Sequence, residues 1–407
     1  MTSVCPAASP GRDDRVSRHF DTMPHSSGAS ALLRAVNAAA PGGSPVVPGN
    51  RPLWLYGAGD LGKLARSHLD AVGQPIAGVV DRNAEAHAND PAWAGIPVHA
   101  PETVSKEVKA KTLLAISIVT SPYAPLHKVL NDQGWTTIVP VYDVAEAFRD
   151  RHPLSNGWFA SQLSELELEE ADLVLAAFAD DASRAHYLRF AAWRLGRQEW
   201  DFAGAPVAPR ERFFIPEIKA ALRPDERFLD AGAHHGGVTA RLLAETEGVF
   251  STVWAVEPDE ASRAALRSYV EGLPPQLRDR IHVVDAVLGA RREPVRFHDG
   301  LGYASQIAVT GQVLRSSEPL DGLDLDVTFI KLHLEGAELA ALIGARETLH
   351  RCRPLVALTV YHDAAGLIET PRWLMRNMPD YAIFMRTHAW CGTGAVLYAL
   401  PKERLVP

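Results

Sequence analysis

Two stretches of the chain alternate short apolar runs with amphipathic segments. In residues 53–150 the apolar runs are LWLYGA, IAGVVD, LLAISIV and TIVPVY, and segments with apolar residues at helical spacing lie between them. From residue 225 onward the alternation returns, with the runs RFLDAGA, TVWAVEPD, HVVDAVLG, TFIKLHLEG and PLVALTVYH. Strands that alternate with helices pair in parallel. The pattern therefore predicts two α/β units, each built on a parallel sheet.

The rest of the chain has other patterns. Residues 1–50 are rich in Ser, Pro, Gly and Ala, which predicts a disordered tail with at most one short helix at SALLRAVNAA. Residues 151–224 carry apolar residues at helical intervals and are predicted to be a helical linker that packs on a neighbouring domain. The last apolar runs, YAIFMRTH and GAVLYALP, are too close for a helix between them, so an antiparallel pair should close the second sheet. The domains expected are a tail at 1–50, a Rossmann-like nucleotide-binding-type domain at 51–150, the linker at 151–224 and a second α/β domain at 225–407.

Composition narrows the class of partner. The formal net charge of the 407 residues is −8, which disfavours nucleic acid, because phosphate binding needs a basic surface. No apolar run approaches the roughly 20 residues that span a bilayer, and the start lacks a signal-peptide pattern. The three cysteines are scattered and form no CxxC pair, which favours a reducing compartment. We expect a cytoplasmic protein that acts on a small molecule, without nucleic acid or membrane as a partner.

The first glycine turn follows the run LWLYGA. Gly57, Gly59 and Gly62 form GxGxxG between a strand and a helix, and Asp81 ends the next apolar run. This arrangement can bind a dinucleotide, with pyrophosphate at the helix N-terminus and ribose on the acid. The sequence thus offers a possible second nucleotide site, for NAD(P) or another nucleotide. The same small residues also occur where a strand and a helix only cross closely, and no partner for hydride transfer follows.

The second glycine turn, DAGAHHGG, differs in its acids. Asp230 precedes Gly232 at the expected strand tip, where a carboxylate would repel pyrophosphate but suit an ammonium. Gly232 and Gly236 let a ligand approach the backbone. Glu257 ends the next strand and could accept ribose hydroxyls, and Asp285 follows the third strand, where it could meet an adenine edge. Ammonium, ribose and adenine together describe S-adenosylmethionine. The alternative is that these acids are solvated strand ends.

Residues from about 227 to 401 resemble the FkbM family of S-adenosylmethionine-dependent methyltransferases. The resemblance rests on FLDAGAHHGG, AVEPD, SQIAVTGQ, FIKLHLEGAELAALIGARETL, RPLVALTVYH and MRTHAWCGTGAVLYALP. It implies a class I methyltransferase fold, in which a mainly parallel sheet has an antiparallel strand near its end. It also implies methyl transfer, most often to a hydroxyl oxygen. Many bacterial members are similar over an N-terminal Rossmann-like domain as well.

One residue departs from the family pattern. The family usually has Asp two residues before the glutamate of the EGAE segment, and this chain has His333 there, before Glu335. Strand alternation predicts Lys331, His333 and Glu335 on one face. We expect His333, Glu335 and His362 to meet near the transferred methyl, as catalytic residues with a histidine as general base. The expected substrate contacts are Lys331, Arg386 and His388.

Two other roles are open for these histidines. Both His333 and His362 could instead hydrogen-bond buried backbone groups. A third reading is metal, since His333, Glu335, His362 and His388 are chemically good ligands for a divalent cation. Their spacing matches no metal motif, so the sequence predicts no metal site.

The leading prediction is a methyltransferase that methylates a hydroxyl of a small molecule or a saccharide. One alternative is a nicotinamide-dependent oxidoreductase centred on the first glycine turn. The other is a binding or scaffold protein whose transferase domain has lost its activity, which the replacement at His333 motivates.

Overall fold

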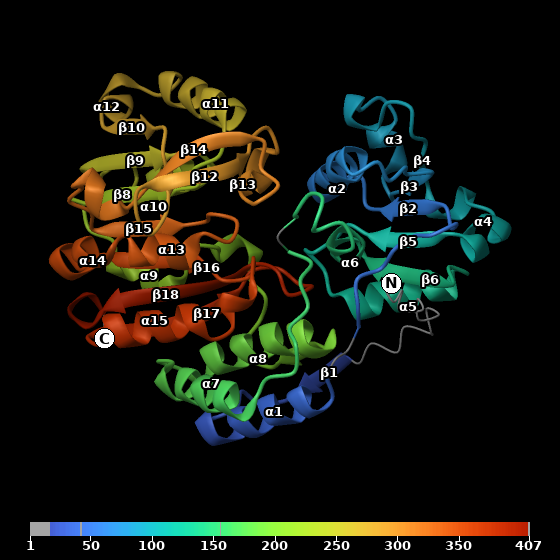
Figure 1. Cartoon of the computed structure of the whole chain (residues 1–407), viewed down its shortest axis with the longest axis horizontal. Coiled ribbons are helices and arrows are strands. Elements are labelled where there is room, and N and C mark those ends of the chain that lie inside the picture. Colours follow the sequence, from blue (N-terminus) through green and yellow to red (C-terminus); the bar gives the residue numbers. More distant parts are fainter. Residues whose placement is uncertain (1–16, 41–42, 155, 406–407) are drawn as a thin grey trace, which may run out of the picture.

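The chain folds into two α/β domains and a helical layer (Figure 1). The structure is a computed structural model that describes residues 17–40, 43–154 and 156–405. Within these residues, no helix combines the length and the apolar character needed to cross a membrane.

The first α/β domain contains a five-stranded sheet in the order β4-β3-β2-β5-β6, with every pair parallel. Its strands are β2 (Leu53–Tyr56), β3 (Gly78–Val80), β4 (Val98–His99), β5 (Leu113–Ile116) and β6 (Thr137–Pro140). Its helices are α2 (Asp60–Ala71), α3 (Ala84–His87), α4 (Lys106–Lys111), α5 (Tyr123–Asp132) and α6 (Val141–Glu146). β2 and β5 are buried along their whole length, as expected for parallel strands covered on both faces.

The second α/β domain contains a seven-stranded sheet in the order β10-β9-β8-β15-β16-β18-β17. Its strands are β8 (Arg227–Ala231), β9 (Thr252–Val256), β10 (Ile281–Val284), β15 (Phe329–Leu332), β16 (Leu355–Thr359), β17 (Tyr381–Thr387) and β18 (Ala395–Pro401). β18 runs antiparallel to both of its neighbours, and the other pairs are parallel. The predicted antiparallel pair at the end of the chain is therefore confirmed.

The helices of this domain connect the strands in sequence. They are α9 (Pro216–Ala221), α10 (Gly237–Glu245), α11 (Glu260–Glu271), α12 (Pro275–Arg278), α13 (Glu338–Ile343), α14 (Arg346–Cys352) and α15 (Glu369–Asn377). A small four-stranded sheet lies between β10 and β15 in the sequence, and the apolar pattern did not predict it. Its strands are β11 (Val287–Leu288), β12 (Glu293–His298), β13 (Gln306–Ile307) and β14 (Val313–Glu318).

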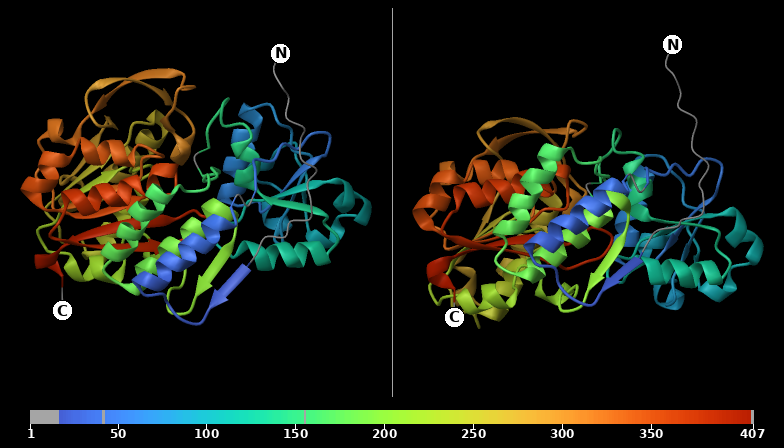
Figure 2. Two further views of the ribbon diagram at one scale, coloured as in Figure 1. Left: turned by 60° about the horizontal axis from the view of Figure 1, so that its bottom comes forward. Right: turned by 90° about the horizontal axis from the view of Figure 1, so that it is seen from below.

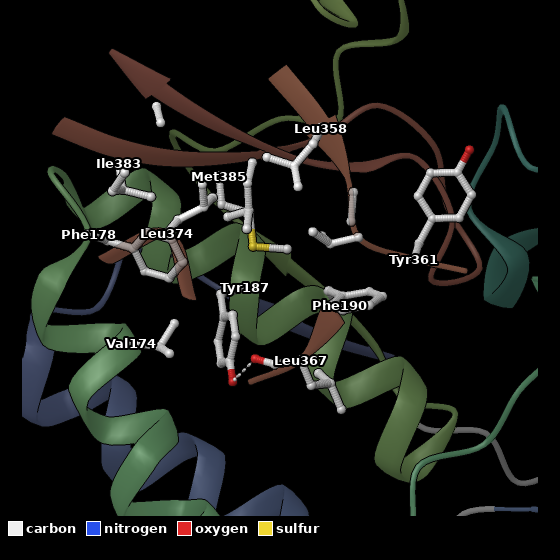
Figure 3. Close-up of a cluster of buried hydrophobic side chains, with 14 of the residues drawn as sticks. Val174, Phe178, Tyr187, Phe190, Leu358, Tyr361, Leu367, Leu374, Ile383 and Met385 are labelled. Atoms are coloured by element: carbon white, nitrogen blue, oxygen red, sulfur yellow. Dashed lines mark hydrogen bonds between the residues drawn. The ribbon is translucent and has the colours of Figure 1, made fainter. Parts of the chain in front are cut away.

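A helical layer covers one face of the seven-stranded sheet near β17. It consists of α1 (Ser26–Ala38), α7 (Glu165–Ala177) and α8 (Asp181–Gly196), and both views of Figure 2 show α1 lying alongside α7 and α8. Figure 3 shows how Phe178, Tyr187 and Phe190 of this layer meet Ile383 and Met385 of β17 in one apolar cluster. The Tyr187 hydroxyl donates to the carbonyl of Leu367 at 3.0 Å. The helical segment is thus part of the core of the second domain.

Residues 17–38 are ordered, which contradicts the expected disordered tail except for the short helix allowed at SALLRAVNAA, most of which lies in α1. β1 (Ser17–Phe20) pairs in parallel with β7 (Glu199–Phe202), and α1 buries Ala29, Leu33 and Val36. These three positions lie at the i, i+4 and i+7 spacing of one helix face. The segment is rich in Ser, Pro, Gly and Ala, which favoured a prediction of disorder. Its helix is ordered by packing against α7 and α8, and composition does not show that packing. Residues 1–16, with Cys5, lie outside the described residues.

Candidate active site

Both glycine turns open onto one cleft between the two α/β domains. The cleft has a volume of about 1420 Å³. From the first domain it is lined by Gly57, Gly59 and Asp81, and from the second by His333 and Glu335. The two motifs that the sequence singled out therefore face the same space.

The second glycine turn needs its glycines for steric reasons. Gly232 has φ +75°, and a Cβ there would lie 2.0 Å from the carbonyl oxygen of His333. Gly236 has φ +87°, and its Cβ would meet the Tyr269 ring at 2.8 Å. L-residues rarely adopt these angles. The turn is therefore fixed by close approach between the ends of β8 and β15.

Asp230 has protein partners on both carboxylate oxygens. Lys331 Nζ donates to Oδ1 at 2.9 Å and Thr239 Oγ1 donates to Oδ2 at 2.8 Å, and Asp230 is fully buried. Lys331 Nζ also donates to the carbonyl of Gly232 at 2.7 Å. The pair lies across adjacent strands in register and supports the glycine turn from inside. Lys331 lines the cleft, and Asp230 does not. Asp230 was predicted to bind the cofactor and Lys331 the substrate; in the structure, both also support the glycine turn.

Glu257 lines a second, smaller cavity beside the turn. Its carboxylate accepts hydrogen bonds from the backbone N–H of His234 at 2.6 Å and of Asp259 at 2.9 Å. Burial is the main cause of the raised pKa of Glu257. The other lining side chains are largely apolar and include Val256, Ala286, Val287, Leu288, Phe297, Ile307 and Leu334. A buried acid and otherwise largely apolar walls suit a ribose and an aromatic base.

Asp285 lies beside the smaller cavity. It forms ion pairs with Arg263, at 3.2 Å, and with Arg315. It does not occur among the described residues that line the cleft or the smaller cavity. Its neighbour Ala286 lines the smaller cavity and its partner Arg263 also donates to the carbonyl of Glu257 at 3.1 Å, so Asp285 lies next to the cavity wall but does not form part of it.

His333, Glu335 and His362 do come together. The Oε1 atom of Glu335 lies 3.0 Å from Nε2 of His333 and 3.2 Å from Nε2 of His362, and the two rings stack at 5.2 Å between centroids. His333 directly follows β15 and His362 closely follows β16, so neighbouring strand ends place them side by side. Glu335 has φ +50°, a costly angle for a non-glycine residue, and this turn directs its carboxylate between the rings.

Glu338 holds this turn, and the sequence did not assign it a role. Its carboxylate accepts from the backbone N–H of Leu334 and of Gly336, both at 2.9 Å, and from Thr359 Oγ1 at 2.7 Å. Nδ1 of His362 donates to the same carboxylate at 2.7 Å. Glu338 thus orients the His362 ring and fixes the backbone around Glu335. The sequence feature that could have indicated this role is the position of Glu338 as the second glutamate of the EGAE segment.

Burial separates the charge states of the two histidines. Desolvation lowers the pKa of His333 to about 4, so its ring is neutral at pH 7. Burial alone would also lower the pKa of His362, but the carboxylates of Glu335 and Glu338 raise it well above its ordinary value. Burial would raise the pKa of Glu338, but the charge of His362 and hydrogen bonds lower it to about 2.

Arg212 and Tyr361 complete the cleft side of this cluster. The Tyr361 hydroxyl lies 3.2 Å from Nε2 of His333, and Arg212 donates to that hydroxyl at 2.5 Å. Both residues line the cleft. Sequence reasoning missed them, because Arg212 lies between predicted elements and tyrosine after a strand is common in cores.

His388 and Arg386 lie outside the cluster. Nε2 of His388 pairs with the Tyr398 hydroxyl at 2.8 Å, and Nδ1 donates to the carbonyl of Ala208 at 2.7 Å. Arg386 forms ion pairs with Asp180 at 2.7 Å and Glu217 at 2.8 Å. Among the described residues, neither of the two lines the cleft or the smaller cavity, so the structure does not place them with His333. Their bonds instead tie β17 and its flank to the segments that precede the sheet.

The first glycine turn has a tight crossing and an open tip. A Cβ on Gly62 would lie 2.2 Å from the carbonyl oxygen of Gly57, whereas a Cβ on Gly59 would meet open space. Asp81 Oδ2 accepts from the backbone N–H of Ala58 at 2.8 Å, so the acid at the end of β3 holds the turn. Gly62 therefore serves helix–strand packing, and Gly57, Gly59 and Asp81 face the cleft.

The fold and this site define a class I methyltransferase domain: the strand order, the antiparallel β18 and a glycine turn followed by an acid at the next strand end occur together. Residues 230–381 match the family model described as Methyltransferase FkbM domain. The predicted resemblance and fold class are thus confirmed.

The structure is similar to solved structures of methyltransferases. The crystal structure of methyltransferase FkbM from Methylobacillus flagellatus KT is 20% identical, with 91% of this chain and 93% of that chain covered and a TM-score of 0.55. At this identity the similarity shows the fold, and it extends over both α/β domains. The precorrin-6y C5,15-methyltransferase from Geobacter metallireducens GS-15 is 14% identical, with 48% of this chain and 96% of that chain covered and a TM-score of 0.28. No curated protein matches the chain.

Proposed function

We propose that the protein is an S-adenosylmethionine-dependent methyltransferase that methylates a hydroxyl group of a small molecule or a saccharide. One observation carries the proposal. The smaller cavity and the cleft share four lining residues, which are Gly232, His234, His333 and Glu335. A cofactor in the first space and an acceptor in the second would meet at these residues, as methyl transfer requires.

The lining of the smaller cavity suits the nucleoside part of the cofactor, but its volume of about 60 Å³ means that the walls would have to open for the nucleoside to enter. Glu257 offers a buried carboxylate for the ribose hydroxyls, and the apolar wall suits the adenine. Gly232 has no side chain that would close the space. When bound, S-adenosylmethionine supplies a methyl group on an already activated sulfonium. The chain's contribution is to align the acceptor and to exclude competing water.

The His333 side of the cluster fits a hydroxyl acceptor. Burial lowers the pKa of His333 to about 4, so the ring is neutral at pH 7 and can take up the acceptor proton only transiently. The acceptor proton would pass to the His333–Glu335 pair and from there to solvent in the cleft. Tyr361, held by Arg212, would hydrogen-bond the acceptor and fix its position.

The first α/β domain supplies the far wall of the acceptor space. The cleft volume of about 1420 Å³ exceeds the roughly 300–1,000 Å³ of ordinary ligand sites, so an acceptor larger than one sugar ring fits. Gly59 and Asp81 line this far end. We infer that the first glycine turn contacts the acceptor and does not serve hydride transfer.

Turnover on a panel of hydroxylated small molecules and saccharides tests the proposal. The expected products are S-adenosylhomocysteine and an acceptor heavier by one methyl group, both followed by mass spectrometry. Gly59→Trp should weaken acceptor binding and leave cofactor affinity unchanged. Cofactor binding without turnover on any acceptor would favour the inactive scaffold, and nicotinamide oxidation lost in Gly59→Trp would favour the oxidoreductase.

A further inference from the structure

We propose that His333, Glu335 and His362 bind a divalent transition-metal cation that faces the acceptor cleft. The three side chains each offer one ligand atom, and these atoms all lie within 4.8 Å of one another. The inference rests on the proposed function only for its role in methyl transfer, since the cation itself can be measured without turnover.

The spacing of the ligand atoms matches coordination geometry. Bonds of about 2.0–2.2 Å to nitrogen and oxygen, at angles between octahedral and tetrahedral, place neighbouring ligand atoms about 3.0–3.4 Å apart. Glu335 Oε1 lies 3.0 Å from His333 Nε2 and 3.2 Å from His362 Nε2. Both histidine nitrogens therefore lie at coordination spacing from Glu335, and they lie within 4.8 Å of each other, so closing that gap would require a small shift of the rings.

The environment of His362 Nε2 is the strongest single indication of a bound cation. The residue is 2% exposed, and its Nε2 has Glu335 Oε1 at 3.2 Å as an ion-pair partner but makes no hydrogen bond of good geometry within the described residues. Buried polar atoms without a partner are costly. A metal ligand bond would satisfy this nitrogen.

Glu338 gives His362 the support that metal-binding histidines have. It accepts the hydrogen bond of Nδ1 at 2.7 Å and so directs Nε2 toward the cluster. A carboxylate behind a ligating imidazole fixes the ring and its tautomer. Without a cation, the alternative is a protonated His362 that forms ion pairs with Glu335 through Nε2 and with Glu338 through Nδ1.

The donor set indicates the class of cation. Two imidazoles and one carboxylate suit Zn²⁺, Co²⁺ or Mn²⁺ better than Mg²⁺ or Ca²⁺, which prefer oxygen ligands only. Three protein ligands leave further positions open, and His333 and Glu335 line the cleft. An acceptor oxygen could occupy an open position, which would hold it beside the shared wall of the two cavities. With the cation bound, Nε2 of His333 is a ligand, so the acceptor proton would leave directly to solvent.

Metal titration of the full chain tests the site. Protein freed of metal with EDTA and then of EDTA is titrated with CoCl₂ by calorimetry and visible absorption, with MgCl₂ as a comparison. We expect one Co²⁺ per chain and much weaker Mg²⁺ binding. Glu335→Gln and His362→Ala should each abolish the stoichiometric site, and Glu338→Gln should weaken it about 10–100-fold.

The controls separate this site from other histidines and from misfolding. His235→Ala removes an exposed histidine on the adjacent glycine turn and should leave Co²⁺ binding unchanged. His333→Asp keeps a ligand at that position and should retain a site with a smaller preference for Co²⁺ over Mg²⁺. Circular dichroism and cofactor affinity report whether each variant is folded.

Two outcomes overturn the metal site: no stoichiometric Co²⁺ binding by the wild-type chain, or binding that survives both Glu335→Gln and His362→Ala. Co²⁺ binding with no methyl transfer to any acceptor would support the site and count against the proposed function. Methyl transfer by metal-free protein at the full rate would support the proposed function and overturn the role of the cation in holding the acceptor.

Discussion

At the scale of single residues, Glu257 and Asp285 form a matched pair for testing the cofactor cavity. Glu257 lines the cavity, whereas Asp285 is held by two arginines outside it. Glu257→Ala should weaken S-adenosylmethionine binding by about 1.5–3 kcal/mol, the cost of losing a charge-assisted hydrogen bond. Asp285→Asn should leave the affinity unchanged. Calorimetry on both variants gives the comparison, and equal losses in the two would show that the cavity is misassigned.

His333 is the residue on which turnover should depend most. His333→Ala should lower turnover about 10²–10⁴-fold, because the variant lacks the imidazole that would accept the acceptor proton or bind the cation. Cofactor affinity should remain nearly the same, since Glu257, which is expected to hold the ribose, is unchanged in this variant. Turnover of His333→Ala and His333→Asp is normalised to the folded fraction from thermal melts. Wild-type turnover in both variants would contradict any catalytic role.

The sequence predicted the meeting of His333, Glu335 and His362 because strand ends converge in a parallel sheet. It did not predict Glu338 as the residue that orients His362, since that bond depends on the left-handed turn at Glu335. The pairing of Lys331 with Asp230 was missed for another reason. It follows from the adjacency of β8 and β15, which are 100 residues apart in sequence and meet only in the sheet.

At the scale of elements, α1 behaves as a part of the methyltransferase core. Leu33 is fully buried against α7 and α8. Leu33→Ala should lower the free energy of unfolding by about 2–5 kcal/mol, the usual cost of a cavity in a packed core. Leu166→Ala on α7 is the control, because that side chain is 75% exposed. Urea denaturation measures both, and a small effect at Leu33 would mean that α1 is not docked.

The helical layer also reaches the active site through Arg194 of α8. Its buried guanidinium donates to the carbonyl of Tyr361 at 2.9 Å and of Gly392 at 2.7 Å. Tyr361 directly precedes His362, so the layer fixes the backbone that carries the cluster. Helical periodicity predicted α8, but its function as a support could not be predicted, since every contact it makes here is distant in sequence.

Strand patterns predicted the two large sheets well and the small sheet not at all. The runs of the large sheets are continuously apolar because both faces are covered. β12 alternates part-buried and exposed residues along its first half, and β13 has only two residues, so neither gives an apolar run. β12 is stabilised as a strand by pairing with β14, and this pairing could not be predicted from the sequence.

At the scale of the whole molecule, buried neutral histidines should make stability depend on pH. Burial lowers the pKa of His68, His333 and His388 to about 4 and that of His186 well below its ordinary value. Between pH 6.5 and 4 the unfolded chain therefore binds more protons than the folded chain, and the free energy of unfolding should fall as the pH falls. The contribution of His362, whose pKa is raised, is fully present below pH 6.5 and does not offset this loss.

Urea denaturation at pH 7 and pH 5 measures this dependence. His68→Gln should reduce the difference between the two pH values, because a glutamine can still donate to the carbonyl of His152 without titrating. His350→Gln changes an exposed histidine of α14 and should leave the difference between the two pH values unchanged. An unfolding free energy that is the same at both pH values would contradict the buried, neutral state of these rings.

The pairing of β1 with β7 bears on the order of events during synthesis. His19 of β1 contacts Asp201 of β7, 182 residues later in the chain. At about 5–20 residues per second the ribosome needs roughly 10–40 s to deliver that partner. The five-stranded sheet can assemble in this interval, while the apolar stripe of α1 stays without its binding surface. Newly made chains should therefore need shielding of this stripe before α7 and α8 emerge, and fast synthesis should raise the yield of native protein.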